Sequence, residues 1–192
     1  MIGKLFLGAL AAAVVAMIWG VLFWAVLPFS SQVIKSTPNE EAVVKALKES
    51  GATTGVYLFP GPPGNAGADA QTKWMEKSKA GPNGMIILQK EGADPMAASI
   101  FIKGFIHYFV SALLAGVLLL LALPNLPSYG SRVLFLTLLG FFAGFFVDLS
   151  NAIWWQHPWN FSLLNLCYAT GCWLVAALVM AWLIRPAREL RR

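Results

Sequence analysis

The chain has 192 residues, and 58% of them are hydrophobic. Only 12% are charged, about half the ~25% share of a typical globular protein, although the net charge is +5. Because the apolar residues are gathered in blocks long enough to cross a bilayer, this composition excludes a water-soluble enzyme, a disulfide-stapled secreted domain and a disordered tail.

Four apolar blocks predict four transmembrane helices. At ~1.5 Å per residue, each block covers the ~30 Å hydrocarbon core of a bilayer. The first block is expected to be a retained anchor, since its apolar run exceeds the 7–15 residues of a signal-peptide core. The fold class is therefore a membrane all-α bundle of four helices, with one long insertion. The blocks run from Leu5 to about Leu27, from Ser99 to Leu123, from about Val133 to Trp154 and from about Phe161 to Ile184.

The long insertion divides the chain into three parts. Residues 1–28 contain the first helix, residues 29–98 form a small α/β segment, and residues 99–192 contain three helices and a basic tail. Thr37-Pro38-Asn39-Glu40 matches a capping box with Thr37 as N-cap. A segment of this size buries little core by itself, so we expect it to rest on the bundle or on a partner. The expected elements are a helix from Glu41 to Ser50 ended by Gly51, a strand from Gly55 to Phe59, a helix from Asp69 to about Lys79 and a strand from Met85 to Gln89.

Charge predicts the orientation. Lys4 and all five arginines, with one acid at Glu189, fall on one side if the helices alternate, whereas segment 29–98 has seven lysines and seven acids. Cations that flank membrane spans stay cytoplasmic, so both termini are predicted to be cytoplasmic and segment 29–98 extracytoplasmic. The basic excess indicates contact with anionic membrane lipids, and no nucleic-acid partner is expected.

Small residues form stripes along two helices. In lipid such stripes let helix backbones approach closely, which leaves two interpretations: packing within this bundle, or a docking face for another membrane protein. The first helix is the better candidate for docking. Short loops also predict that the second, third and fourth helices are antiparallel neighbours. The stripes contain Gly8, Ala12, Ala16 and Gly20 in the first helix, and Gly140 and Gly144 in the third.

Ionisable groups within a bilayer are costly and indicate a functional site by default. Lys103 and His107 share a face of the second helix, and Asp148 lies at a similar predicted depth in the third. We therefore expect a contact between Asp148 and the Lys103/His107 pair, either as a structural ion pair or as part of a ligand or proton site. The predicted ligand site contains Lys103, His107, Asp148, Asn151, Trp154, Trp155 and Asn165.

No catalytic or metal-binding pattern is found in the sequence. Cys167 and Cys172 are five residues apart, a spacing that fits neither a redox pair nor a zinc site. Haem ligation by His107 and His157 is the weaker possibility. Because no phosphate-binding loop, zinc-protease motif or nucleophile elbow is present, we expect no cofactor, no metal and no catalytic residues.

Several short motifs resemble a family of uncharacterised, small bacterial inner-membrane proteins. They are Trp19-Gly20-x-x-Phe23-Trp24-x-x-Leu27-Pro28, then Gly55-Val56-Tyr57-x-x-Pro60, Gly81-Pro82 and Trp154-Trp155. The resemblance implies a bacterial inner-membrane location and the same four-span topology, and it implies no activity. Family members tend to follow Leu-Pro with an aromatic residue and a histidine, whereas here Phe29-Ser30 follow, so no role of that histidine is carried over.

Two functions remain open from the sequence. The first is a non-enzymatic accessory or assembly subunit that docks on a larger membrane complex or on a second copy of itself. The alternative is a lipid- or quinone-binding membrane protein with a polar site at the outer ends of the second to fourth helices. A transporter is disfavoured, since no internal repeat or broken polar helix pair is evident.

Overall fold

The computed structural model describes residues 1–186. They form two separate units, one made of Met1–Lys35 with the chain from Pro95 onward, the other of Ser36–Asp94. Four charged residues that entered the prediction of orientation lie outside the described residues: Arg188, Glu189, Arg191 and Arg192.

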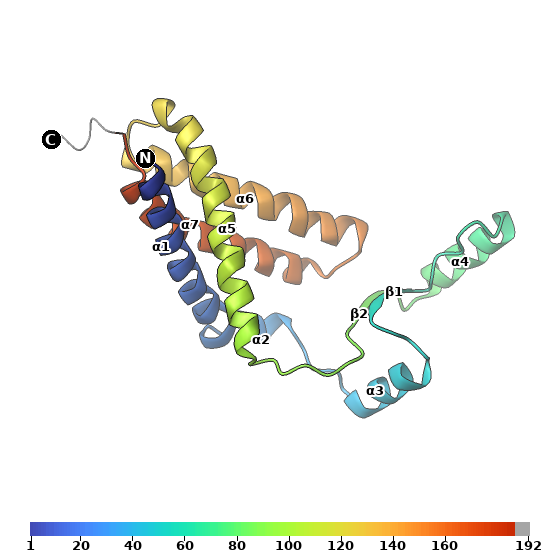
Figure 1. Ribbon diagram of the computed structural model, residues 1–192. Coiled ribbons are helices and arrows are strands. Elements are labelled where there is room, and N and C mark those ends of the chain that lie inside the picture. Colours follow the sequence, from blue (N-terminus) through green and yellow to red (C-terminus); the bar gives the residue numbers. More distant parts are fainter. Residues whose placement is uncertain (187–192) are drawn as a thin grey trace. The chain divides into compact units, whose positions relative to one another are not determined.

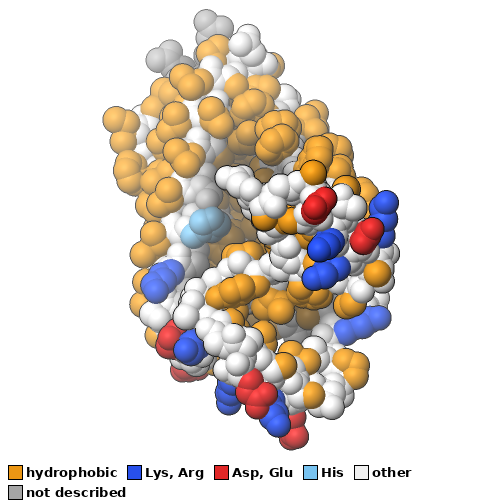
Figure 2. Space-filling model, turned by 90° about the vertical axis from the view of Figure 1, so that its right-hand side faces the viewer, with side chains coloured by type: hydrophobic (Ala, Val, Ile, Leu, Met, Phe, Trp, Pro, Cys, Tyr) orange, Lys and Arg blue, Asp and Glu red, His pale blue; other side chains and the backbone are white. Residues whose placement is uncertain are grey.

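The first unit contains four helices that are long and apolar enough to cross a membrane. They are α1 (Ile2–Val21), which continues as a π-helical turn (Leu22–Val26), α5 (Ala98–Ala122), α6 (Tyr129–Trp154) and α7 (Trp159–Leu183). Figure 2 shows hydrophobic side chains over much of the visible face, with the charged side chains gathered over one part of it. The prediction of a multi-pass, mostly helical membrane protein is confirmed.

The helices do not pack in chain order. Helix α7 packs against both α6 and α1, and α5 packs along α1. Helices α5 and α6 contact each other only sparsely, and Figure 1 shows them diverging from the turn that joins them. The prediction of antiparallel neighbours therefore holds for α6 and α7 and is wrong for α5 and α6. The reason is that the alanine-rich α1 offers α5 a closer packing surface than α6 does.

The small-residue stripe of α1 lies inside the bundle. Gly8, Ala12 and Ala16 are buried, and a Cβ added at Gly8 would lie 3.2 Å from the Ile184 side chain of the α7 end. At Gly20 an added Cβ would lie 3.2 Å and 3.3 Å from two tyrosine hydroxyls, those of α5 and α7. The stripe therefore packs against α5 and α7, and its three buried members are not accessible to a second protein.

Helices α6 and α7 approach each other through the second stripe. A Cβ added at Gly140 would lie 2.1 Å from Cγ of Trp173, closer than real Cβ atoms approach. At Gly144 it would lie 3.2 Å from both Leu166 and Ala169. Gly140 and Gly144 therefore form the seam that lets the large Trp173 ring lie against the α6 backbone.

Arg132, in the first turn of α6, is 1% exposed. Its Nε donates a hydrogen bond to the Ala181 carbonyl at 3.2 Å, and its Nη1 donates to the carbonyls of Leu126 and Pro127 at 3.4 and 3.2 Å. Carbonyls at a helix C-terminus and in a turn lack backbone partners and carry partial negative charge. Arg132 thus joins the start of α6 to the end of α7.

The second unit contains α3 (Glu40–Glu49), β1 (Gly55–Phe59), α4 (Ala68–Ala80) and β2 (Gly84–Leu88). The strands pair antiparallel, with Tyr57 opposite Ile86, so the predicted two-stranded sheet is present. No side chain from Ser36 to Asp94 is buried. The two helices consequently do not cover the sheet with a closed core.

The start of α3 differs from the prediction. Asn39 is the N-cap, and its Oδ1 accepts a hydrogen bond from the Ala42 backbone N–H at 3.0 Å. The predicted N-cap, Thr37, is wrong, because the helix begins at Glu40 and a Thr37 cap would need Glu40 at the third helical position. Asn is at least as good an N-cap as Thr, and Glu40 and Glu41 then occupy the positive first turn.

Replacing Asn39 with alanine should destabilise α3 by about 1 kcal/mol, since one exposed backbone N–H loses its side-chain acceptor. Hydrogen exchange of the α3 amides measures this loss. Thr37→Ala is the matched control and should leave the exchange rates unchanged. Faster exchange in Thr37→Ala, with unchanged exchange in Asn39→Ala, would identify Thr37 as the N-cap and contradict this prediction.

Candidate functional site

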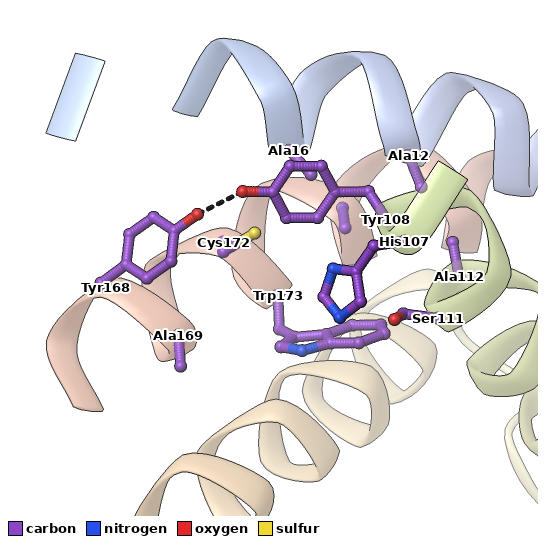
Figure 3. Close-up of a pocket in the computed structure, with 11 residues that line it drawn as sticks. Ala12, Ala16, His107, Tyr108, Ser111, Ala112, Tyr168, Ala169, Cys172 and Trp173 are labelled. Carbon is purple, nitrogen blue, oxygen red and sulfur yellow. Dashed lines mark hydrogen bonds between the residues drawn. The ribbon is translucent and has the colours of Figure 1, made fainter. Parts of the chain in front are cut away.

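A pocket of about 180 Å³ lies between α1, α5 and α7. Five of its lining residues are alanines, and these small side chains leave room between the three helices. Figure 3 shows the remaining side chains grouped around this space. The alanines are Ala12 and Ala16 from α1, Ala112 from α5, and Ala169 and Ala176 from α7.

His107 and Ser111 line the pocket from α5. They are four residues apart and so share one face of the helix, and Figure 3 shows both beside the ring of Trp173. His107 is exposed, whereas Ser111 is half-buried, so the histidine is the more accessible end of the pair. In residues 1–186 the structure records no hydrogen bond from either side chain.

A pair of tyrosines closes one end of the pocket. The hydroxyls of Tyr108 and Tyr168 hydrogen-bond to each other, as the dashed line in Figure 3 marks. The Trp19 Nε1–H donates to the Tyr168 carbonyl at 3.1 Å, and the rings of Phe23 and Trp24 lie 5.2 Å from the Tyr168 ring. The two hydroxyls are therefore partnered and held in place by aromatic packing.

The structure does not bring Asp148 to Lys103 or His107. Among the described residues no ion pair or hydrogen bond joins them, and neither Asp148 nor Lys103 lines the pocket. A Cβ added at Gly144 would lie 3.5 Å from Asp148 Oδ2, which places the carboxylate along the α6–α7 seam. Because α5 packs on α1, its polar face does not meet the polar face of α6.

The other predicted site residues surround the turn between α6 and α7. Trp154 and Trp155 are exposed there, and the Asn151 carbonyl accepts backbone hydrogen bonds from Trp155 and His157. Asn165 is half-buried on α7. None of them lines the pocket, so His107 is the single member of the predicted set that does.

Several pocket residues were not singled out for a ligand site from the sequence. Tyr168, Cys172 and Trp173 reach the pocket because α7 packs against α1, and Tyr108 reaches it because α5 packs along α1. One available signal was the i, i+4 series of Tyr168, Cys172 and Ala176 on α7. Cys172 is buried, Cys167 is exposed, and both are free thiols.

The structure does not bring His157 to the pocket that His107 lines. His157 lies in the α6–α7 turn, where its ring packs 6.3 Å from that of Phe161, and it does not line the pocket. Within residues 1–186, no group of three or more His, Cys, Asp or Glu side chains could hold a metal ion.

These features define a multi-pass helical membrane protein with an alanine-lined pocket beside one histidine. No protein family, curated protein or solved structure matches the chain. The function is therefore argued from the geometry of the chain itself.

Proposed function

We propose that this chain is a non-enzymatic accessory or assembly subunit of a larger membrane complex in the bacterial inner membrane. In this proposal both termini are cytoplasmic, and the unit Ser36–Asp94 is extracytoplasmic and docks on the partner. The partner is a membrane protein with its own extracytoplasmic surface. A second copy of the chain is the alternative occupant.

The incomplete core of the Ser36–Asp94 unit carries this proposal. Its strands expose apolar side chains: Val56 is 64% exposed and Ile87 is 76% exposed. Val43 and Val44 of α3 are also exposed. An isolated two-stranded hairpin is marginally stable in water at best, and exposed apolar side chains on such a small unit favour association. A docked partner would supply the apolar surface that the unit lacks.

The distribution of cations supports the proposed orientation. Lys4 lies at the start of α1, Arg132 at the start of α6 and Arg185 just beyond α7. Contacts between Gly8 and Ile184 and between Arg132 and Ala181 place these helix ends together. Cations near span ends favour the cytoplasmic side.

A photocrosslinking amino acid in place of Ile87 tests the proposal in native membranes. We expect a specific adduct larger than the 20.8 kDa chain, with its yield lowered severalfold by Val56→Asp, because a charge would have to be desolvated in the interface. A crosslinker at Lys79, exposed on α4, is the matched control and should give little of that adduct.

The mass of the adduct separates the two occupants. An adduct of twice the chain mass identifies a second copy, and another discrete mass identifies a different partner. Equal, diffuse labelling from positions 87 and 79, unaffected by Val56→Asp, would contradict docking through this unit.

A further inference from the structure

The pocket between α1, α5 and α7 is large enough for a small ligand. Its volume of about 180 Å³ exceeds the ~150 Å³ of an engineered apolar cavity that binds benzene. It can therefore take one substituted ring or a short piece of an apolar chain. The alanines and Trp173 give it apolar walls, and ligand pockets commonly combine such walls with a few polar groups.

His107 lies within the apolar candidate membrane span of α5. It is nine residues into α5 from Ala98, about 13 Å by helical rise. An imidazole always offers at least one N–H donor, and polar groups within a bilayer are costly without a partner. Since the described structure records no hydrogen bond from His107 or Ser111, a molecule in the pocket could satisfy both.

The remaining lining residues restrict the chemistry of that molecule. In the pair of Tyr108 and Tyr168 one hydroxyl donates to the other, and the described structure records no hydrogen-bond partner for the side-chain donors of His107 and Ser111. Among the described residues no Lys, Arg, Asp or Glu lines the pocket. A charged head group would therefore lose its hydration there without gaining a counter-charge. A neutral hydrogen-bond acceptor costs less to desolvate, and hydrogen bonds from His107 and Ser111 offset that cost.

We propose that this pocket binds a neutral, membrane-soluble molecule whose carbonyl oxygen accepts hydrogen bonds from His107 and Ser111. The apolar part of the molecule packs between the alanines and the Trp173 ring, and any longer tail leaves past the exposed His107 into lipid. Two sources share this chemistry: the ring of a membrane quinone and the ester of an uncharged acylglycerol. This site is separate from the docking unit Ser36–Asp94.

Native mass spectrometry of the full chain in mild detergent tests the proposal, with a decyl-tailed benzoquinone and dioctanoylglycerol as separate probes. We expect one equivalent of at least one probe to bind saturably. His107→Phe keeps a ring and removes the donor, so it should weaken binding about fivefold to tenfold. Ser111→Leu should abolish binding because the larger side chain fills the pocket.

His157→Phe is the matched control, because His157 lies outside the pocket, and it should bind as the unmodified chain does. Saturable binding of the quinone alone identifies a quinone site, and tighter binding of the acylglycerol identifies a lipid site. The proposal is overturned if neither probe binds saturably. It is equally overturned if His107→Phe and Ser111→Leu bind with unchanged affinity.

Discussion

Arg132→Gln is expected to lower the free energy of unfolding by about 3 kcal/mol. The substitution removes a buried hydrogen bond to the Ala181 carbonyl and two partly buried ones to the carbonyls of Leu126 and Pro127. A buried acceptor left without a partner costs about 1–3 kcal/mol, and the two partly buried bonds add less because water can replace them. Unfolding by SDS titration from mild detergent, followed by circular dichroism, measures the change.

Arg185→Gln is the charge-matched control for this prediction. It removes one positive charge near the same end of the bundle from a side chain that is less buried, so its effect should stay within about 0.5 kcal/mol. Arg132→Lys should be intermediate, because an ammonium keeps the charge and loses the planar fork of donors. Equal effects of Arg132→Gln and Arg185→Gln would show that Arg132 acts only through its charge.

Gly140→Ala is expected to destabilise the bundle by about 2 kcal/mol, the usual cost of overpacking a tight contact. The new Cβ would lie 2.1 Å from Cγ and 2.3 Å from Cβ of Trp173. Because Cβ of Trp173 is fixed to the α7 backbone, rotation of the ring cannot relieve the clash. Helices α6 and α7 must separate, and the SDS concentration at the unfolding midpoint should fall.

Gly130→Ala provides the matched control on the same helix. An added Cβ there meets no atom within 4 Å, and alanine is the better helix former by up to ~1 kcal/mol. Stability should therefore be unchanged or slightly higher. If both alanine variants behaved alike, the close approach of α6 to Trp173 would not contribute to packing.

The four spans were predictable because span length and hydropathy are local properties of the chain. The block from Leu5 to Leu27 needs no knowledge of its neighbours to be identified as a membrane helix, and the structure places a helix over Ile2–Val26. The strand from Gly55 to Phe59 was predicted for a similar reason, since Pro60 ends it. The N-cap of α3 was predicted at the wrong residue because Asn39 and Thr37, two positions apart, are both suitable N-cap residues.

The site was only partly predictable. The i, i+4 spacing of His107 and Ser111 places them on one face of α5 from sequence alone. Asp148 was expected to meet them because its depth in α6 is similar. Depth along the membrane normal does not determine which helices are adjacent, and α5 packs on α1. Tyr168 and Trp173 therefore line the pocket together with His107, and Asp148 does not.

By itself the sequence determined the number of spans, since apolar run length is a local property, and the flanking charges predict an orientation. Only the tertiary structure decided the order of the helices around α7, the burial of Arg132 and the position of the pocket. Within lipid, helix surfaces are similarly apolar, so hydropathy does not select neighbours. Selection depends on the fit of particular side chains, such as Trp173 against Gly140 and Tyr168 against Gly20.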